Sequence, residues 1–244
     1  MISVITITNK QDDHIYRNIF TNYINQSYTD KELILIINRD NADTFYRHRQ
    51  YKNIDIYKNI LDEILVERNI NKQTQELIKN TIKIYKFPLN SLGDCLNKSA
   101  LLARGKYWCK CDDDDKYGSK YLENSILYLI KSGADIVGKR RVFVEDKQTK
   151  SLYLTNTDKP QTHKMTSFIR GPTFFCKRTL VLELQFPPIN TGEDTEFLRR
   201  CIKASRQIYT TDENDFVYIR NSEIGQTSTL SLKKILGNNY TKLN

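Results

Sequence analysis

The sequence has no long hydrophobic run and few of the residues that mark specialised scaffolds. No apolar stretch approaches the length of a membrane span, and the start, MISVITITNKQDD, lacks the regions of a signal peptide. The five cysteines are odd in number and lack a zinc-binding spacing, so we expect buried, reduced thiols. These absences predict a cytoplasmic protein. The cysteines are Cys95, Cys109, Cys111, Cys176 and Cys201.

The charge is unbalanced, with a formal net charge of +9. Such an excess favours nucleic acid, an anionic membrane surface or phosphorylated small molecules as partners. The sequence contains no zinc-finger spacing, no aromatic RNA-binding motif and no dense Lys/Arg stretch, so we expect no nucleic-acid partner. Phosphorylated ligands remain, together with peripheral contact at the anionic inner face of a membrane. The sequence leaves the oligomeric state open.

The chain shows no internal repeat, low-complexity segment or Pro/Gly/Ser linker, and residues 1–244 are therefore expected to form a single domain. Apolar runs alternate with helical patterns, which predicts an α/β fold with a mainly parallel, three-layer sheet and a more irregular C-terminal half. The expected strands are 2–8, 32–38, 81–87, 107–111, 134–146 and 150–154, and the expected helices are 15–24, 92–103 and 193–204, with 41–81 mostly helical.

Four consecutive carboxylates in CDDDDKYG (residues 111–118) follow the predicted strand 107–111. Adjacent carboxylates repel one another, so a partly buried run needs positive charge nearby. A solvated acidic face is one alternative. An EF-hand loop fails because Lys116 and Tyr117 occupy its fifth and sixth positions, and an internal DDDDK is no protease tag. Since strand ends in α/β sheets hold ligands, the run predicts a divalent cation with a phosphate-bearing substrate.

Four segments together resemble the motifs of family 2 glycosyltransferases, which have the GT-A (Rossmann-like) fold: SVITITNK, NQSYTDKELILIIN, LGDCLNKSALLARGKYWCKCDDDD and GPTFFCKRTLVLELQFPPINTGEDTEFLRRC. The resemblance covers nearly the whole chain and is nearest to bacterial enzymes that build surface polysaccharides and teichoic-acid-like polymers. It implies an inverting, metal-dependent hexosyltransferase. Residues 1–118 would bind a nucleotide sugar, with a UDP-sugar favoured, and residues 119–244 would bind a glycan or lipid-linked acceptor.

The resemblance also assigns donor-side roles. Asp112 resembles the family residue near the ribose, and Asp114 the ligand of Mn²⁺ or Mg²⁺, although a run of four leaves the register ambiguous by one residue. Gln226 stands where many relatives have a metal-binding His, which puts metal affinity in doubt. The other positions near the nucleotide are Thr8, Asn38, Asp40, Asn97, Lys98, Asp113 and Arg220.

On the acceptor side, the resemblance implies that Asp194 is the catalytic base, with Glu193 as the less favoured choice. An acidic first helical turn, common on many helices, is the alternative reading of both residues. RGPTFF resembles a glycine-containing acceptor-side strand, in which Gly171, Pro172 and Thr173 would line the site.

Two other functions compete with a sugar transferase. A nucleotidyltransferase would need a Gly-rich phosphate loop after the first strand, and TNKQDD contains no glycine. A catalytically silent glycan- or nucleotide-binding or scaffold module is the main alternative, and Gln226 gives it weight. Residues 228–240 are interpreted as a terminal helix packed on the core, with an amphipathic membrane contact as the alternative.

Overall fold

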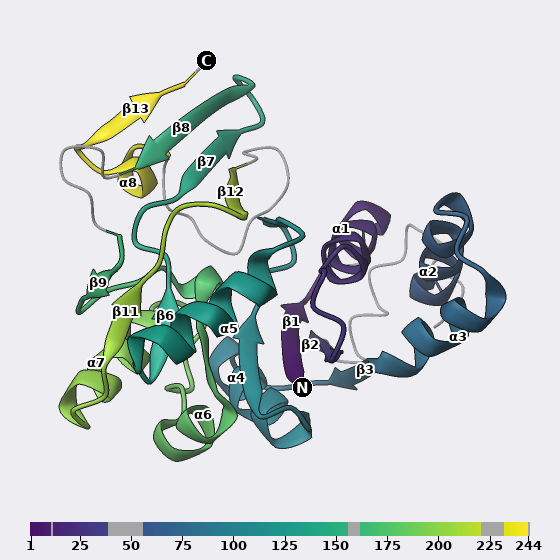
Figure 1. Ribbon diagram of the computed structural model, residues 1–244, viewed down its shortest axis with the longest axis horizontal. Helices are drawn as coiled ribbons and strands as arrows, with labels where there is room; N and C mark the ends of the chain where they lie inside the picture. The colour runs from purple at the N-terminus through teal and green to yellow at the C-terminus, as the bar shows by residue number, and fades with distance from the viewer. Residues whose placement is uncertain (11, 39–55, 156–161, 221–231, 244) are drawn as a thin grey trace.

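A computed structural model describes residues 1–10, 12–38, 56–155, 162–220 and 232–243. These residues form two sheets with helices around them; in Figure 1 the C-terminus lies at the top, beside β13, and the N-terminus lies near the middle of the lower edge. Two expected site residues, Asp40 and Gln226, lie outside the described residues. In the described part, no helix is long and apolar enough to cross a membrane.

In the described part of the chain, the larger sheet has eight strands in the order β3-β2-β1-β4-β10-β6-β11-β9. Of these, β10 and β9 run antiparallel to their neighbours, and the other six strands are parallel to one another, as the alternating sequence pattern predicted. The strands are β1 (Ile2–Thr8), β2 (Lys31–Asn38), β3 (Ile82–Phe87), β4 (Tyr107–Lys110), β6 (Ile136–Gly138), β9 (Lys164–Met165), β10 (Phe175–Lys177) and β11 (Ile208–Thr210).

Helices cover both faces of this sheet, so the core has three layers. Side chains alternate along β2: Leu33 and Leu35 join one apolar core, whereas Ile34 joins the other. The first core includes residues of α1, α2 and α5, and the second includes residues of α4, α6 and α7. The helices are α1 (Asp13–Ile24), α2 (Ile56–Glu67), α3 (Lys72–Thr81), α4 (Leu92–Leu102), α5 (Tyr121–Ser132), α6 (Arg178–Leu184), α7 (Glu193–Lys203) and α8 (Leu232–Leu236).

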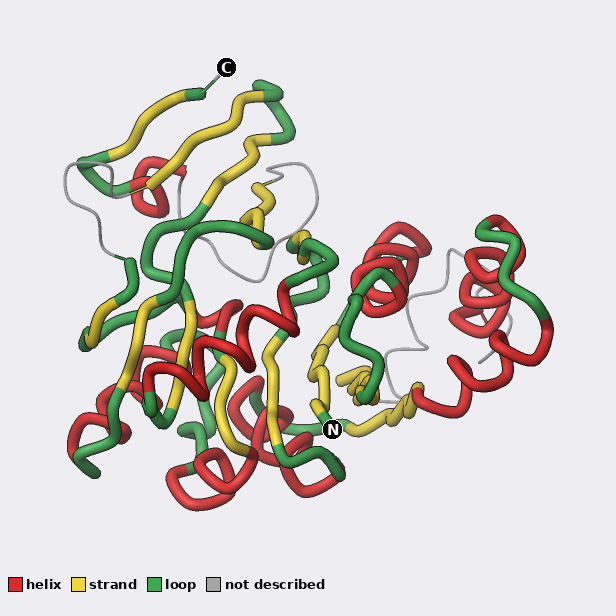
Figure 2. Tube along the Cα trace, in the orientation of Figure 1, coloured by secondary structure: helices red, strands yellow, loops and turns green. Residues whose placement is uncertain are grey.

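A second sheet, with five strands among the described residues, stands apart from the first in the upper part of Figure 2. Its order is β13-β8-β7-β12-β5. Residues 134–146, expected as strands, divide between β6 in the first sheet and β7 in the second, with residues 139–142 crossing between them. The strands are β5 (Lys116–Tyr117), β7 (Phe143–Asp146), β8 (Ser151–Thr155), β12 (Phe216–Arg220) and β13 (Tyr240–Lys242).

The short strand β4 is fixed between the layers by its buried side chains. Trp108 is fully buried, and its Nε1 donates to Ser99 Oγ of α4 over 3.0 Å. The aromatic pair Trp108 and Phe186 ties the same strand to the segment after α6. Because β4 runs parallel to β1 and β2, the acidic run after β4 emerges at the same edge of the sheet as Thr8 and Asn38.

Candidate active site

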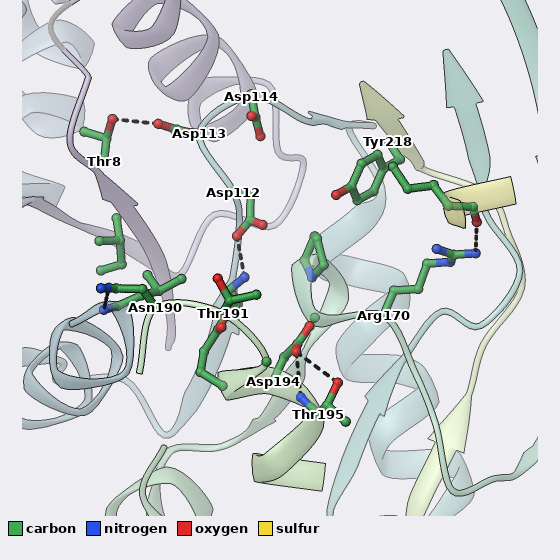
Figure 3. A pocket seen from close by; sticks show the side chains of 18 of the residues that line it. Thr8, Asp112, Asp113, Asp114, Arg170, Asn190, Thr191, Asp194, Thr195 and Tyr218 are labelled. Atoms are coloured by element: carbon green, nitrogen blue, oxygen red, sulfur yellow. Dashed lines mark hydrogen bonds and ion pairs between the residues drawn. The ribbon is translucent and has the colours of Figure 1, made fainter. Parts of the chain in front are cut away.

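One cavity of about 640 Å³ opens at this edge of the sheet. Its walls come from the ends of β1, β2 and β4, the start of α7, the 3-10 turn Gly171–Thr173, and residues of β12 and α8. In Figure 3, Thr8 and Asp113 lie on one side and Arg170 and Tyr218 on the other, with Asp112 and Asp194 between them. The fold therefore brings together polar groups from both halves of the chain.

The four acids of the run have different surroundings. Asp112, Asp113 and Asp114 line the cavity. Asp115 is 1% exposed and does not, and it accepts a hydrogen bond from the backbone N–H of Ile219 over 2.9 Å. Burial, with Asp114 and Asp112 nearby, raises the pKa of Asp115 well above its usual value. Asp115 therefore joins the run to β12, while the three preceding acids face the cavity.

Asp113 is held by the end of β1. Thr8 Oγ1 donates to Asp113 Oδ2 over 2.6 Å, and Lys10 Nζ lies 3.0 Å from Asp113 Oδ1 (Figure 3 shows the first of these). Burial and the neighbouring Asp114 raise the pKa of Asp113 to about 6, against the opposing effects of Lys10 and Thr8. Asp113 thus fixes the position of the run against β1, in addition to lining the cavity.

Two lysines supply the positive charge that the run requires. Lys10 Nζ bridges Asp113 and Asp114, 3.2 Å from Asp114 Oδ2. Lys110 Nζ lies 2.6 Å from Asp112 Oδ1, and its side chain is only 6% exposed. Burial lowers the pKa of Lys110, but Asp112 and Glu193 outweigh that effect and the pKa is raised. Both lysines are therefore charged at neutral pH.

These two lysines were missed by the sequence interpretation. The sequence did contain a signal for Lys110, because this lysine lies between Cys109 and Cys111 at the end of an apolar strand that four acids follow. A lysine enclosed in such a strand needs a carboxylate partner. Lys10 had no local signal, since its partners lie about a hundred positions away.

Glu193 and Asp194 begin α7, after Gly192 in the left-handed conformation (φ 82°). Glu193 is 6% exposed, and burial raises its pKa to about 7, with Lys110 opposing the shift. Asp194 is more exposed and accepts a hydrogen bond from the backbone N–H of Thr195 over 2.6 Å. The helix N-terminus and Lys110 both favour negative charge at this point. Asp194 is the better placed of the two to meet a substrate.

Gly171 gives Asp194 its space. A Cβ atom at Gly171 would lie 2.9 Å from both Cβ and Cγ of Asp194, and still closer to Oδ2. Gly171 and Pro172 line the cavity, while Thr173 is buried behind them, where its Oγ1 accepts from the Lys139 backbone N–H. The expected acceptor-side strand is therefore a 3-10 turn at 171–173, followed by β10. Thr173 supports the turn instead of facing the cavity.

The remaining expected donor residues divide into two groups. Thr8, Asn38 and Arg220 line the cavity. Asn97 and Lys98 are not among the described residues that line the cavity. Asn97 exchanges two hydrogen bonds with the backbone of Phe186, and Lys98 lies over the ring of Phe87. The resemblance implied that both residues lie near the nucleotide. In the structure they lie on α4 and contact other parts of the fold instead of lining the cavity.

Other residues of the cavity wall carried no signal in the sequence. Arg170 is largely buried, and its guanidinium donates to the backbone carbonyls of Ile235 and Arg140. Burial lowers the pKa of Arg170. Phe168 and Tyr218 add aromatic surface beside it. Helix α8 also lines this wall, and the Ile235 carbonyl of α8 accepts the hydrogen bond from Arg170. The local pattern of residues 228–240 does not predict this contact.

The donor atoms present suit a hard divalent cation that also binds a phosphate. Within the described residues, no three His, Cys, Asp or Glu side chains cluster as a metal site by themselves. Asp112 and Asp114 line the cavity, and each has one carboxylate oxygen that receives no hydrogen bond from the described part of the chain. One or two carboxylates, completed by substrate phosphates and water, are the usual ligands of protein-bound Mg²⁺. The pair therefore fits Mg²⁺ or Mn²⁺.

Comparisons with known proteins agree with this fold. The first is S. aureus TarS 1–349 in complex with UDP-GlcNAc, with 14% identity, a TM-score of 0.62, and coverage of 95% of this chain and 61% of that chain. The second is the mannosyltransferase PcManGT from Pyrobaculum calidifontis in complex with GDP-Man and Mn²⁺, with 15% identity, a TM-score of 0.57, and coverage of 90% and 56%. No protein-family model and no curated protein sequence matches the chain.

These similarities establish the fold. The chain has a mixed α/β, GT-A-like architecture with a mainly parallel central sheet, as expected from its sequence. It spans about three-fifths of the length of the two solved structures named above.

Proposed function

We propose that the protein is a glycosyltransferase that moves a sugar from a nucleotide-sugar donor to a hydroxyl group of an acceptor. One observation carries the proposal: a single cavity brings Asp112 and Asp114, at the end of β4, together with Glu193 and Asp194, about eighty residues later, at the start of α7. The bound ligands named for the similar structures, UDP-GlcNAc and GDP-Man, support a nucleotide-sugar donor.

The donor would bind between the ends of β1, β2 and β4. Thr8 and Asn38 would line the nucleoside end, and Arg220 could approach the diphosphate. Asp112 and Asp114 would hold Mn²⁺ or Mg²⁺ at the diphosphate. When bound, the cation supplies electrostatic stabilisation of the charge that develops on the leaving diphosphate. Lys110 would keep Asp112 in place through its 2.6 Å ion pair.

Asp194 would act as the catalytic base. Its carboxylate takes the proton of the acceptor hydroxyl, whose oxygen forms a bond to the anomeric carbon as the bond to the diphosphate oxygen breaks. Attack opposite the leaving group inverts the anomeric configuration. Glu193 is the weaker choice, because its side chain is buried and less accessible to an acceptor.

The acceptor would bind on the side of Gly171 and Pro172. Three basic residues, Arg170, Arg220 and Lys234, line that part of the wall or lie next to it, together with the aromatic Phe168 and Tyr218. Such a wall suits a sugar acceptor that carries phosphate, either free or linked to lipid. This acceptor class agrees with the resemblance to bacterial enzymes of surface-polysaccharide and teichoic-acid-type synthesis. A cytoplasmic enzyme that meets its acceptor at an anionic membrane would use the net charge of +9.

The test is thermal stability against a panel of nucleoside diphosphates and nucleotide sugars, each with and without Mn²⁺, in the wild type and Asp114→Ala. A ligand that binds only the folded state raises the melting temperature. We expect one nucleotide to stabilise the wild type, in a metal-dependent manner that the variant loses. The responding donor would then be used in a transfer assay, with the anomeric configuration of the product read by NMR. No response to any nucleotide would instead favour the silent binding module.

A further inference from the structure

Lys10 is paired with Asp114, one of the carboxylates expected to bind a cation. Its Nζ lies 3.2 Å from Asp114 Oδ2 and 3.0 Å from Asp113 Oδ1, and its side chain is 12% exposed. Among the described residues, Lys10 is the one charged partner of Asp114. Asp113, in contrast, has a second partner, because it also accepts a hydrogen bond from Thr8. The carboxylate expected to bind the cation is therefore the one that depends on Lys10 alone.

The two lysines of the acidic run differ in freedom to move. Lys110 is the last residue of β4, lies buried at the cavity wall, and is paired with Asp112. Lys10 lies in the segment after β1, beyond the last strand residue, and carries its charge on a flexible four-carbon stem. Lys10 is not among the described residues that line the cavity, but its partners Asp113 and Asp114 are, so rotation of that stem would take the ammonium from Asp114 toward the cavity.

We propose that Lys10 couples cation binding to diphosphate binding, by holding Asp114 while the cavity is empty and transferring its ammonium to the donor diphosphate when the cation takes that carboxylate. This inference rests on the proposed function. A dication on the other oxygen of Asp114 would repel the Lys10 ammonium, so binding of the cation alone would cost the Lys10 ion pair. A diphosphate provides a new partner for the displaced ammonium and removes that cost. Cation and nucleotide therefore each bind weakly alone and strengthen one another.

The coupling can be measured by binding alone, without any assay of transfer. Isothermal titration would give the affinity for Mn²⁺ with and without UDP, and then GDP, in the wild type and in Lys10→Met. Removal of the competing ammonium should raise the affinity for Mn²⁺ alone, and it should shrink the mutual enhancement between Mn²⁺ and the nucleotide by about tenfold, in the usual range of coupling energies. Because linkage is reciprocal, the nucleotide titrated with and without Mn²⁺ must give the same factor.

Two further variants control for charge and for folding. Lys116→Met removes a lysine adjacent in sequence to the run, but Lys116 pairs with Glu145 over 2.7 Å and is half exposed, so it should bind as the wild type does. Lys10→Gln keeps a hydrogen-bond donor for Asp113 without the charge, and it replaces Lys10→Met if that variant melts early. Circular dichroism and a thermal melt report folding for each protein.

Each result decides the inference. If both Lys10 variants fold and bind Mn²⁺ alone no more tightly than the wild type, with unchanged enhancement by nucleotide, Lys10 is merely a structural partner and the inference is wrong. An equal gain in Lys116→Met would also overturn it, because the effect would then be one of general charge. A wild type that binds neither nucleotide nor Mn²⁺ in any combination would instead remove the proposed function, and the inference with it.

Discussion

Gly171 and Asp194 are in contact, and the contact requires that residue 171 have no side chain. A Cβ atom there would overlap the Asp194 carboxylate, with Cγ at 2.9 Å and Oδ2 closer. The turn that lines the acceptor side of the cavity and the helix that carries the expected base are thus fitted to each other, although they are 23 positions apart (194 − 171). A small change in this contact should therefore lower the catalytic rate before it lowers the stability of the fold.

Gly171→Ala should therefore reduce kcat by about a hundredfold, since misplacement of a catalytic group by about 1 Å can cost that much. The new methyl group would push Asp194 away from its present position. Steady-state kinetics with the responding donor would measure kcat and KM separately, and KM for the donor should change little.

Gly105→Ala provides the matched control, because its Cβ would also overlap a neighbour, the Ser3 side chain and backbone, but away from the cavity. Overpacking of this kind typically costs about 1–3 kcal/mol of stability. We expect a lower melting temperature with near-normal kcat. If both variants lost kcat in proportion to their melting temperatures, the special role of Gly171 would be disproved.

Glu193 should make stability depend on pH. Its pKa is about 7 in the folded protein, because of burial, against 4.5 as the reference value. A raised carboxyl pKa means that the stabilisation is complete below pH 4.5 and is lost as the pH rises through 7. Glu193→Gln carries no such proton, so it should equal the wild type near pH 4 and exceed it at pH 8 by up to about 3 kcal/mol.

Urea unfolding at pH 4, 6 and 8 would measure this difference. Glu196→Gln is the control, because Glu196 lies in the same turn, is more exposed, and pairs with Arg199 at the surface. Its stability should stay parallel to that of the wild type. Parallel curves for Glu193→Gln as well would show that burial does not raise the pKa of Glu193.

Asp115 should behave differently from Asp112 and Asp114 when each is replaced by its amide. Asp115→Asn keeps an oxygen for the Ile219 backbone N–H and removes a buried carboxyl, so we expect metal-dependent nucleotide binding and full stability at pH 8. Asp112→Asn and Asp114→Asn lose carboxylates that line the cavity, so nucleotide stabilisation should disappear. Thermal shift with Mn²⁺ and nucleotide separates these outcomes, and a loss in Asp115→Asn alone would move the metal register by one.

The sequence pattern predicted those strands and helices whose formation depends mainly on neighbouring residues in the chain. The strand at 2–8 was predicted from a short apolar, β-branched run, and the strand at 32–38 from a continuous aliphatic run of the kind expected in a strand covered on both faces. The helix 92–103 was predicted from its apolar spacing, and it ends one residue earlier, at Leu102. The same reasoning predicted that the four acids would follow the end of a strand, at the edge of the sheet that holds ligands.

Long-range partners could not be predicted in the same way. The contact of Lys10 with Asp114 spans 104 positions, and that of Asn97 with Phe186 spans 89. Nothing in the sequence near either residue identifies its partner, because the pairing depends on how strands and helices pack. The resemblance placed Asn97 near the nucleotide from its sequence position, whereas tertiary contacts turn its amide toward another backbone segment.

A variant of Asn97 therefore tests whether this residue binds the nucleotide, as the resemblance implies, or joins two parts of the fold, as its contacts indicate. Its Nδ2 donates to the Phe186 carbonyl over 2.9 Å, and its Oδ1 accepts from the Phe186 N–H over 2.7 Å, which joins α4 to the segment after α6. Asn97→Ala leaves both backbone groups of Phe186 unsatisfied, at about 1–3 kcal/mol for each buried group. Chemical denaturation should show that loss, while the affinity for nucleotide and Mn²⁺ stays at the wild-type value. Lys98→Ala, on the next residue of the same helix, removes only a lysine over the Phe87 ring and should change neither quantity. If Asn97→Ala instead bound nucleotide weakly with its stability intact, the amide would belong to the donor site, and α4 would have to move toward the cavity when the donor binds.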